Sequence, residues 1–303
     1  CRIMKKIIVI GSSNVDMVMK TSHLPAPGET ILGGEFLMNQ GGKGANQAVA
    51  VRRMGGNLIF MAKLGNDILG RQSLEYFENE GIDTRYLTLT ENAASGVALI
   101  SVDSQAENSI IVASGANMLL NEQDVDRITE EMEEGDILLM QLEIPLQTVV
   151  YAAKKAFEKG VKMVLNPAPA CNLPQELFPY LYMITPNAIE AEMLAGMKLG
   201  TDAEEVGKKL YEMGVKNVII TLGAKGCLII EEGISYHVDA FKVKPIDTTA
   251  AGDTFNGALC VGLAEGMALK QAAVMASKAS SIAVTRMGAQ PSIPYRKEVN
   301  TNI

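Results

Sequence analysis

The stretch TTAAGDTFNGAL, residues 248–259, places one acid among small residues at a point where a loop is expected to become a helix. The acid is Asp253, and the small residues around it are Ala250, Ala251, Gly252 and Gly257. The first N–H groups of a helix have no partner within the helix, so a helix start without bulky side chains attracts anions, phosphate above all. The stretch therefore predicts an anion site with a carboxylate at its mouth.

Asp253 has two interpretations. An acid at a helix start is common, because the positive end of the helix dipole stabilises it mildly. Alternatively, a hydroxyl group loses its proton to Asp253 while it attacks a phosphate held in the anion site. The loop before Asp253 is stripped of side chains, which favours the second interpretation and indicates phosphoryl transfer, a reaction that depends on positioning and electrostatics.

Outward from this stretch, short apolar runs rich in β-branched residues recur along the chain. Several are apolar at every position, which is typical of strands that are covered on both faces, as in parallel sheets. The predicted strands are KKIIVIG (5–11), NLIFMAKLG (57–65), DILLMQLE (136–143), VKMVLN (161–166), YMIT (182–185), NVIITLG (217–223) and CLII (227–230).

Helical patterns alternate with these runs. They are ANQAVAVRRM (45–54), ILGRQSLEYFENEG (68–81), NEQDVDRITEEME (121–133), PLQTVVYAAKKAFEKG (145–160) and DAEEVGKKLYEMG (202–214). Thr201 and Glu204 have the spacing of a capping box, and Gly160 and Gly214 are expected helix C-caps. Alternation over most of the length predicts an α/β fold with a doubly wound, mostly parallel sheet flanked by helices.

Two stretches break the alternation, at about 15–38 and 95–113. Both read as strands joined by turns, and GVALISV and NSIIVA in the second flank a polar turn, which predicts a hairpin. They are either decoration on the edge of the main sheet or, as we favour, a small β-sheet lid over a site. Because no linker or repeat divides the chain, residues 1–303 are expected to form one domain.

Composition excludes several classes of function. A net charge of −8 disfavours a general nucleic-acid surface, and no apolar run reaches the length of a membrane span. The four cysteines form no C-x-x-C pair, so a reducing, cytoplasmic location fits best. With His23 and His237 as the only histidines, acid–base chemistry is expected to depend on carboxylates.

The common nucleotide fingerprints are absent. GSSNVD (11–16) follows the first strand but lacks the glycines of a dinucleotide site, which disfavours a dehydrogenase. GGKGAN (41–46) resembles a P-loop, but no Ser or Thr follows Lys43. Its glycines allow close backbone approach to a ligand, although a tight loop entering a helix explains them equally well.

Two further groups of polar residues are candidate ligand contacts. Asn14 and Asp16 follow the first strand, where α/β sheets bind ligands, and their side chains suit the hydroxyls of a polyol. Asn187 and Glu190 share a face at a helix start. They either favour the helix dipole or order a hydrated magnesium ion near phosphates. TLGAKG (221–226) is a small-residue loop that can pass beneath a nucleotide.

Together, GGKGAN and DTTAAGDTFNGA (247–258) resemble, in this order, the two signatures of the PfkB carbohydrate kinase family. The blocks GSSNVD, PGET, LEIP, NPAPA, TPNAIEAE, TLGAKG and SIAVTRMGAQPSIP are most similar to the members that phosphorylate ribose. The resemblance covers essentially the whole chain. It implies that ATP and D-ribose are converted to ADP and ribose 5-phosphate by transfer to O5.

The resemblance also implies roles for individual residues. Asp253 is the expected base, and Ala250, Ala251 and Gly252 line the anion hole. The implied sugar contacts are Ser12, Asn14, Asp16, Gly42, Lys43, Gly44, Asn46 and Glu143, with Asp253. The implied nucleotide contacts are Asn187, Thr221, Gly223, Gly226, Gly252 and Ser277; Ser277 stands where the family pattern leads us to expect asparagine.

Two ions and a dimer are implied as well. Glu190 belongs to the region of a Mg²⁺ ion that accompanies ATP. An activating K⁺ is expected at Asp247, Thr249, Ala283, Arg286, Gly288 and Ser292, mostly through backbone carbonyls, unless Asp247 merely caps a turn. The lid is expected to pair two subunits. Alternative functions are another sugar or nucleoside kinase of the family, or a sugar- or nucleotide-binding regulator without catalysis.

Overall fold

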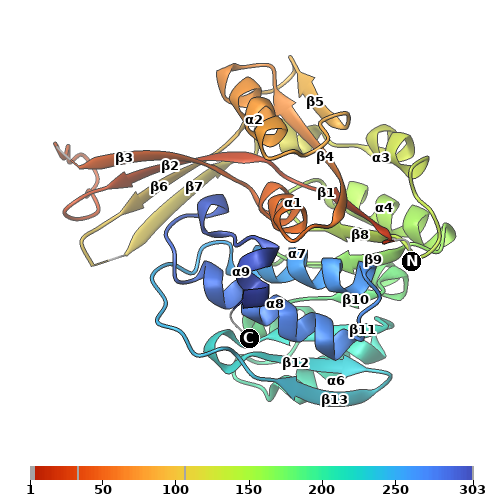
Figure 1. Ribbon diagram of the computed structural model, residues 1–303. Coiled ribbons are helices and arrows are strands. Elements are labelled where there is room, and N and C mark those ends of the chain that lie inside the picture. Colours follow the sequence, from red (N-terminus) through yellow and green to blue (C-terminus); the bar gives the residue numbers. More distant parts are fainter. Residues whose placement is uncertain (1–3, 33, 106, 302–303) are drawn as a thin grey trace.

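The computed structural model describes residues 4–32, 34–105 and 107–301. Residues 33 and 106, within the two expected lid stretches, lie outside the described residues, as do residues 1–3 and 302–303. A large sheet lies between two layers of helices, and a smaller sheet projects from one end of it (Figure 1). Within the described residues, no helix has the length and apolar character needed to cross a bilayer.

The large sheet confirms the predicted fold class. In the described chain it has nine strands in the order β13-β12-β11-β10-β9-β8-β1-β4-β5, and all neighbours are parallel except at β11–β12 and β12–β13. The strands are β1 (Lys6–Ile10), β4 (Asn57–Gly65), β5 (Leu87–Thr90), β8 (Ile137–Met140), β9 (Lys162–Leu165), β10 (Met183–Ile184), β11 (Asn217–Thr221), β12 (Cys227–Glu231) and β13 (Ile234–Val238).

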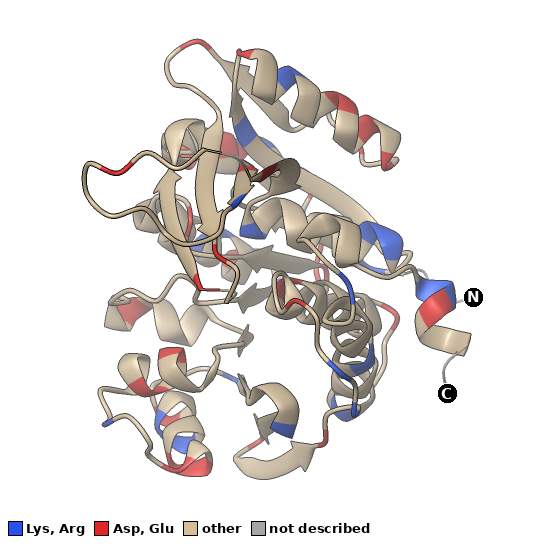
Figure 2. Cartoon of the chain, turned by 90° about the vertical axis from the view of Figure 1, so that its left-hand side faces the viewer, with Lys and Arg blue, Asp and Glu red and all other residues tan. Residues whose placement is uncertain are grey.

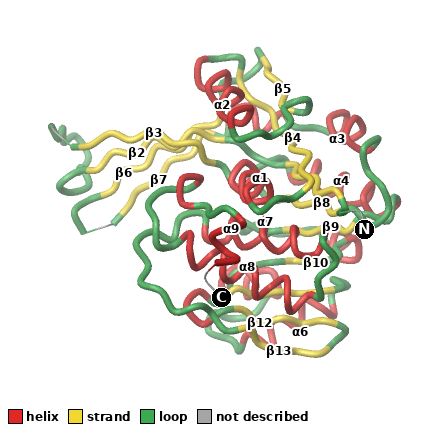
Figure 3. Tube along the Cα trace, viewed as in Figure 1, coloured by secondary structure: helices red, strands yellow, loops and turns green. Residues whose placement is uncertain are grey.

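The helices cover the two faces of this sheet, as the alternation along the chain predicts (Figure 3). One face packs against α1 (Lys43–Arg53), α2 (Ile68–Asn79), α7 (Ala251–Ala264), α8 (Leu269–Ala283) and α9 (Arg296–Thr301). The other packs against α3 (Glu122–Thr129), α4 (Leu146–Glu158), α5 (Ala188–Ala195) and α6 (Ala203–Glu212).

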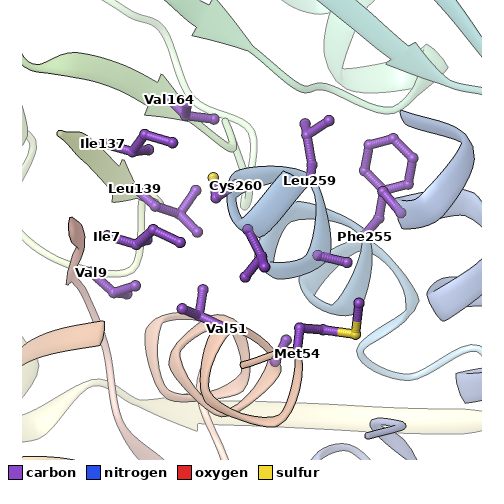
Figure 4. Packing of buried hydrophobic residues seen from close by; sticks show 14 of the residues in the cluster. Ile7, Val9, Val51, Met54, Ile137, Leu139, Val164, Phe255, Leu259 and Cys260 are labelled. Atoms are coloured by element: carbon purple, nitrogen blue, oxygen red, sulfur yellow. The ribbon is translucent and has the colours of Figure 1, made fainter. Parts of the chain in front are cut away.

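The central strand β1 shows why its sequence is apolar at successive positions. Ile7 and Val9 belong to the core on the side of α1 and α7, whereas Ile8 and Ile10 belong to the core on the side of α3 and α4. All four side chains are fully buried. Figure 4 shows the first of these cores, where β1, β8, α1 and α7 meet.

The smaller sheet consists of the two stretches that break the alternation. Its order is β3-β2-β6-β7, with β2 (Asn14–Lys20), β3 (Glu35–Gly41), β6 (Gly96–Val102) and β7 (Asn108–Ala113). The predicted hairpin is confirmed, since β6 and β7 pair antiparallel. These strands form a sheet separate from the large one, so they are not an extension of its edge.

Two local predictions need correction. The capping box of Thr201 and Glu204 does not form, because the side chain of Asp202 accepts the N–H groups of Glu204 and Glu205 instead. Strands β5 and β13 of the large sheet were not predicted, although Glu232 and Gly233, with φ of 51° and 77°, form the tight turn that joins β13 to β12. Both central residues of such a hairpin turn need positive φ, which Glu adopts rarely, so the signal was weak.

The contact between α1 and α7 depends on Gly257. A Cβ atom at this position would lie 2.5 Å from Cβ of Ala50 and 3.0 Å from the backbone oxygen of Gln47. Replacement by Ala would therefore push the two helices apart. This matters beyond stability, because α1 and α7 carry the two predicted signatures.

We predict that Gly257→Ala lowers the free energy of unfolding by about 1–2 kcal/mol. Overpacking costs about 1–3 kcal/mol, which exceeds the gain of about 1 kcal/mol from higher helix propensity. Chemical denaturation measures the change. Gly252→Ala is the matched control on the same helix, since a Cβ atom there meets no atom within 4 Å. Equal stability of both variants would show that α1 and α7 are not in tight contact.

Candidate active site

Two cavities meet at the start of α7. The first, of about 480 Å³, lies at the carboxyl ends of the central parallel strands, the edge where α/β sheets bind ligands. The second, of about 470 Å³, lies between the loop after β11 and the helices α7 and α8. Thr221, Thr248, Ala251 and Gly252 line both cavities. A molecule in one cavity can therefore reach a molecule in the other at this junction.

Asp253 lies at the junction, in the first turn of α7, and is 6% exposed. Its Oδ2 accepts a hydrogen bond from Asn46 Nδ2 (2.9 Å), and its Oδ1 accepts one from Gln47 Nε2 (3.0 Å). Both amides come from α1. A buried carboxylate needs such partners, so the helix of the first signature fixes the acid of the second.

The backbone before Asp253 is bent into an uncommon conformation. Ala250 has φ of 58° and ψ of 13°, the left-handed region, which costs a non-glycine residue energy. The N–H of Ala251 donates a hydrogen bond to the carbonyl of Thr248 (3.2 Å). Within the described chain, the N–H groups of Gly252 and Asp253 have no acceptor, and they are therefore free to bind an anion.

A chain of buried amides supports Asp253, and sequence reasoning missed its members. Gln141 Nε2 donates to Gln47 Oε1 (2.6 Å), and Gln47 Nε2 donates to Asn166 Oδ1 (3.1 Å) as well as to Asp253. Asn166 Nδ2 in turn donates to the carbonyl of Thr185 (3.2 Å). The orientation of the Gln47 amide is thus fixed with its donor toward Asp253. Asn166 is the first residue of the block NPAPA, and this block is the sequence feature that could have pointed to it.

Most of the expected sugar contacts line the first cavity: Asn14, Asp16, Gly42, Lys43, Asn46, Glu143 and Asp253. Two do not. Ser12 and Gly44 lie behind the wall, where Ser12 Oγ donates to Glu143 Oε2 (2.5 Å) and accepts from the N–H of Gly44 (3.2 Å). The N–H of Lys43 also donates to Glu143 (3.0 Å). Ser12 therefore holds Glu143 in place, and the N–H of Gly44 in turn holds the hydroxyl of Ser12.

The carboxylates of the first cavity influence one another. Burial, and then the charges of Glu143 and Asp253, raise the pKa of Asp16 to about 6. Burial of Lys43 favours its neutral form, but the surrounding carboxylates Asp253, Glu143 and Glu190 outweigh burial and raise the pKa of its ammonium group. The cavity thus holds hydrogen-bond acceptors with one firmly cationic side chain. Ala98, Ile110 and Val112 of the smaller sheet add an apolar wall.

Asn187 and Glu190 form a capping box at the start of α5. Each side chain accepts the backbone N–H of the other residue at 2.8 Å, and both residues also line the first cavity. Burial outweighs this hydrogen bond and the charge of Lys43, so the pKa of Glu190 is raised. In the described residues, no group of three or more acidic, His or Cys side chains is arranged to hold a metal. A metal here would need ligands from a phosphate and water.

The second cavity is lined by the expected nucleotide contacts Thr221, Gly223, Gly226, Gly252 and Ser277, whereas Asn187 lies in the first. Sequence reasoning missed its other wall, a segment before the second signature. That wall contains Ala240, Phe241, Lys242, Val243 and Pro245. The alternation of apolar and basic residues in FKVKP, next to the signature, was the available signal.

Most of the residues expected to bind a monovalent cation lie outside both cavities. Asp247 joins two segments, because its Oδ1 accepts from the N–H (2.9 Å) and hydroxyl (2.6 Å) of Thr249 and its Oδ2 accepts from the N–H of Gly288 (2.8 Å). Burial raises the pKa of Asp247, but these hydrogen bonds outweigh it and the pKa is lowered. Among the expected cation residues, Thr249 alone lines either cavity within the described chain. Ala283 ends α8, and Arg286, Gly288 and Ser292 lie on the segment after it.

Comparison with known proteins identifies the family of the chain. The chain is 43% identical over 296 residues to "Ribokinase" of Haemophilus influenzae, with 97% of both chains covered. The structure of ribokinase from Thermotoga maritima has a TM-score of 0.90 at 40% identity and covers 98% of both chains. The structure of Arabidopsis thaliana ribokinase complexed with ribose and ATP has a TM-score of 0.90 at 30% identity, covering 99% of this chain and 98% of the other. The model of the pfkB family of carbohydrate kinases matches residues 4–296, and the chain belongs to this family.

Proposed function

We propose that this protein is an enzyme that transfers the terminal phosphoryl group of ATP to O5 of D-ribose, giving ADP and D-ribose 5-phosphate. The observation that carries the proposal is the position of Asp253, a buried carboxylate beside unpaired N–H groups where two cavities meet. Full-length similarity to ribokinases supports ribose as the sugar.

Ribose occupies the first cavity in this proposal. The carboxylates of Asp16 and Glu143 accept hydrogen bonds from sugar hydroxyls, while Asn14 and Lys43 donate to hydroxyl oxygens. The triphosphate enters from the second cavity, and its terminal phosphate lies at the junction. O5 and the phosphorus atom are thereby held within reach of each other.

The reaction is a single displacement. O5 forms a bond to the terminal phosphorus, the bond to the bridging oxygen of ADP breaks, and the proton of O5 passes to the carboxylate of Asp253. The N–H groups of Gly252 and Asp253 stabilise the negative charge on the moving phosphoryl group. Asn46 and Gln47 keep the carboxylate in place for the proton transfer.

Mg²⁺ accompanies ATP and is held near Glu190. Such an ion prefers oxygen ligands and retains water, so one carboxylate and the phosphates suffice to place it. Glu190 fits this role, since one of its carboxylate oxygens accepts from Asn187 and the other forms no hydrogen bond within the described chain. When bound, the ion neutralises part of the phosphate charge.

In this proposal the chain forms a single domain, and the smaller sheet is a lid whose strands cover the sugar. Met19, Phe36, Leu99 and Ile111 on this sheet are between 39% and 68% exposed, which supports the pairing of two subunits through it. Sedimentation equilibrium measures the mass of the assembly. A monomer at micromolar concentration would contradict the pairing.

The composition of the chain supports small-molecule partners in the cytoplasm. Acidic and basic residues are interspersed along the elements in Figure 2, as expected for a protein without a nucleic-acid or membrane surface. In the described residues, Cys171, Cys227 and Cys260 are free thiols, which suits a reducing compartment.

A monovalent cation, K⁺, is proposed where Asp247 meets the segment from Ala283 to Ser292. The ion would neutralise Asp247 and fix the backbone that leads into residues 250–252. It would act by shaping the anion hole and would contact neither sugar nor nucleotide. The hydrogen bonds of Asp247 to Thr249 and Gly288 leave the alternative that this carboxylate only caps a turn.

ATP consumption across pentoses, hexoses and nucleosides tests the function. We expect turnover to be fastest with D-ribose, and Asp253→Asn to slow it by about 10²–10⁴-fold, because the amide cannot accept the proton. Ribose binding, measured by calorimetry, should change little. Faster turnover with another sugar or a nucleoside would reassign the substrate. Absence of turnover with all of them would support a binding protein, and turnover of Asp253→Asn within a few-fold of the parent would remove Asp253 as the base.

The raised pKa of Asp16 predicts a pH dependence of sugar binding. Asp16 loses its charge as the pH falls through about 6, and a protonated carboxyl is a weaker hydrogen-bond acceptor. KM for ribose should therefore rise below about pH 6 and stay constant above it. The variant Asp16→Asn, which has no charge to lose, should bind ribose weakly at every pH. A flat profile in the parent would mean that Asp16 does not accept from the sugar.

The cation proposal predicts activation by K⁺. Activity should rise several-fold when K⁺ replaces a bulky organic cation at constant ionic strength, because small misplacement of the anion hole slows the reaction. Asp247→Ala should abolish this rise. Equal rates in both salts would show that the loop holds its shape without an ion, and Asp247 would then serve as a turn cap.

A further inference from the structure

Asn117 lies behind the sugar cavity, outside every motif of the sequence analysis. It belongs to the short 3₁₀ helix η1 (Gly115–Leu119), which follows β7, and it is 1% exposed. Its Nδ2 donates to Asn14 Oδ1 at 2.8 Å and to the carbonyl of Ser114 at 2.9 Å. Its Oδ1 accepts from the N–H of Ser13 at 2.9 Å.

These partners fix the orientation of the Asn117 amide. The N–H of Ser13 can only donate, and the carbonyl of Ser114 can only accept. Oδ1 of Asn117 must therefore face Ser13, and Nδ2 must face Ser114. The same Nδ2 also faces Asn14, so the side chain of Asn14 has to present its oxygen to Asn117.

It follows that Asn14 turns its amide nitrogen to the sugar cavity. Asn14 lines that cavity, and its Nδ2 makes no hydrogen bond to any other described residue. An isolated Asn side chain can present either its oxygen or its nitrogen to a ligand. With Asn117 behind it, Asn14 is restricted to donating to a hydroxyl oxygen, whereas Asp16 and Glu143 can only accept.

Space for this pair is left by Gly96. It lies opposite Asn14 in the pairing of β2 with β6. A Cβ atom on Gly96 would overlap both Asn14 Oδ1 and Asn117 Nδ2. The backbone of β6 thus packs directly against the pair and holds it in place.

We infer that Asn117 is a positioning residue that sets Asn14 as a hydrogen-bond donor and thereby contributes to the choice of sugar. This inference rests on the proposed phosphorylation of ribose. It does not make Asn117 a substrate contact, because Asn117 acts through Asn14. The same amide also connects the segment before β2 with the segment after β7, the two ends of the smaller sheet.

A double-mutant cycle tests the inference, with KM for D-ribose, KM for ATP and kcat measured for Asn14→Ala, Asn117→Ala and the double variant. Each single variant should raise KM for ribose by about tenfold, the effect of one lost hydrogen bond, while KM for ATP changes less than twofold. In the Asn14→Ala background, Asn117→Ala should change KM for ribose less than twofold. The same factor in both backgrounds would overturn the inference, since it would show that Asn117 acts independently of Asn14.

Deoxy sugars provide a second readout. The parent should discriminate against the deoxyribose that lacks the hydroxyl facing Asn14, and both single variants should lose the same discrimination. Ser95→Ala is the matched control: this buried serine lies directly before β6, its hydroxyl donates to Asp67, and within the described residues it forms no hydrogen bond to Asn14. It should keep the parent's discrimination. A loss of discrimination in Ser95→Ala would overturn the inference, because it would show a general effect of the smaller sheet.

Asn14→Asp covers the case in which Asn117→Ala does not fold. The aspartate has the same shape and still accepts from Asn117, but it offers an acceptor to the cavity in place of a donor. We expect Asn14→Asp to weaken the binding of ribose at least as much as Asn14→Ala does. Ribose binding as tight as in the parent would overturn the inference. The parent's own turnover with ribose tests the proposed function separately from either result.

Discussion

The hydrogen bonds between the carboxylate of Asp253 and the amides of Asn46 and Gln47 are the contact on which the site depends. A buried carboxylate without donors is costly, and both donors here come from α1, while the carboxylate comes from α7. Gly257 lets the two helices approach closely enough for these bonds. At the other end of α1, Gly42 and Gly44 allow its start to lie against residues 11–14 after β1. The geometry of the proposed base is therefore built into the packing of the core.

The charges of the candidate site distinguish the region proposed for the sugar from the region proposed for the phosphates. Asp16, Glu143 and Asp253 make the sugar cavity rich in acceptors, which suits hydroxyl groups and disfavours a phosphate. The unpaired N–H groups at the start of α7 lie at the junction with the second cavity and favour an anion. In the proposed reaction, this arrangement would orient both substrates before any covalent change. The acidic neighbours of Lys43 keep its ammonium group charged. Such a group can donate either to a hydroxyl or to a phosphate, so Lys43 suits both regions.

The sequence predicts the fold and the main site residues because their signals are local. A run such as KKIIVIG is apolar at successive positions since both faces of its strand are buried, and the small residues around Asp253 mark a helix start at any position in a chain. Gln47 and Gln141 carry no local signal, and Asn166 carries only that of the block NPAPA. Their hydrogen bonds join residues 94 to 206 positions apart, and only the packed fold brings them to Asp253. The same holds for Ser12, whose hydroxyl donates to Glu143, and for Gly44, whose N–H donates to Ser12; both support the cavity wall.

The central claim is that Asp253 and the start of α7 act together on one hydroxyl and one phosphate. A crystal structure with D-ribose and a non-hydrolysable ATP analogue tests it most directly. The account predicts O5 of ribose within hydrogen-bond distance of the Asp253 carboxylate, with the terminal phosphate facing the N–H groups of Gly252 and Asp253. A different ribose hydroxyl next to Asp253, or a terminal phosphate bound away from the start of α7, would contradict it.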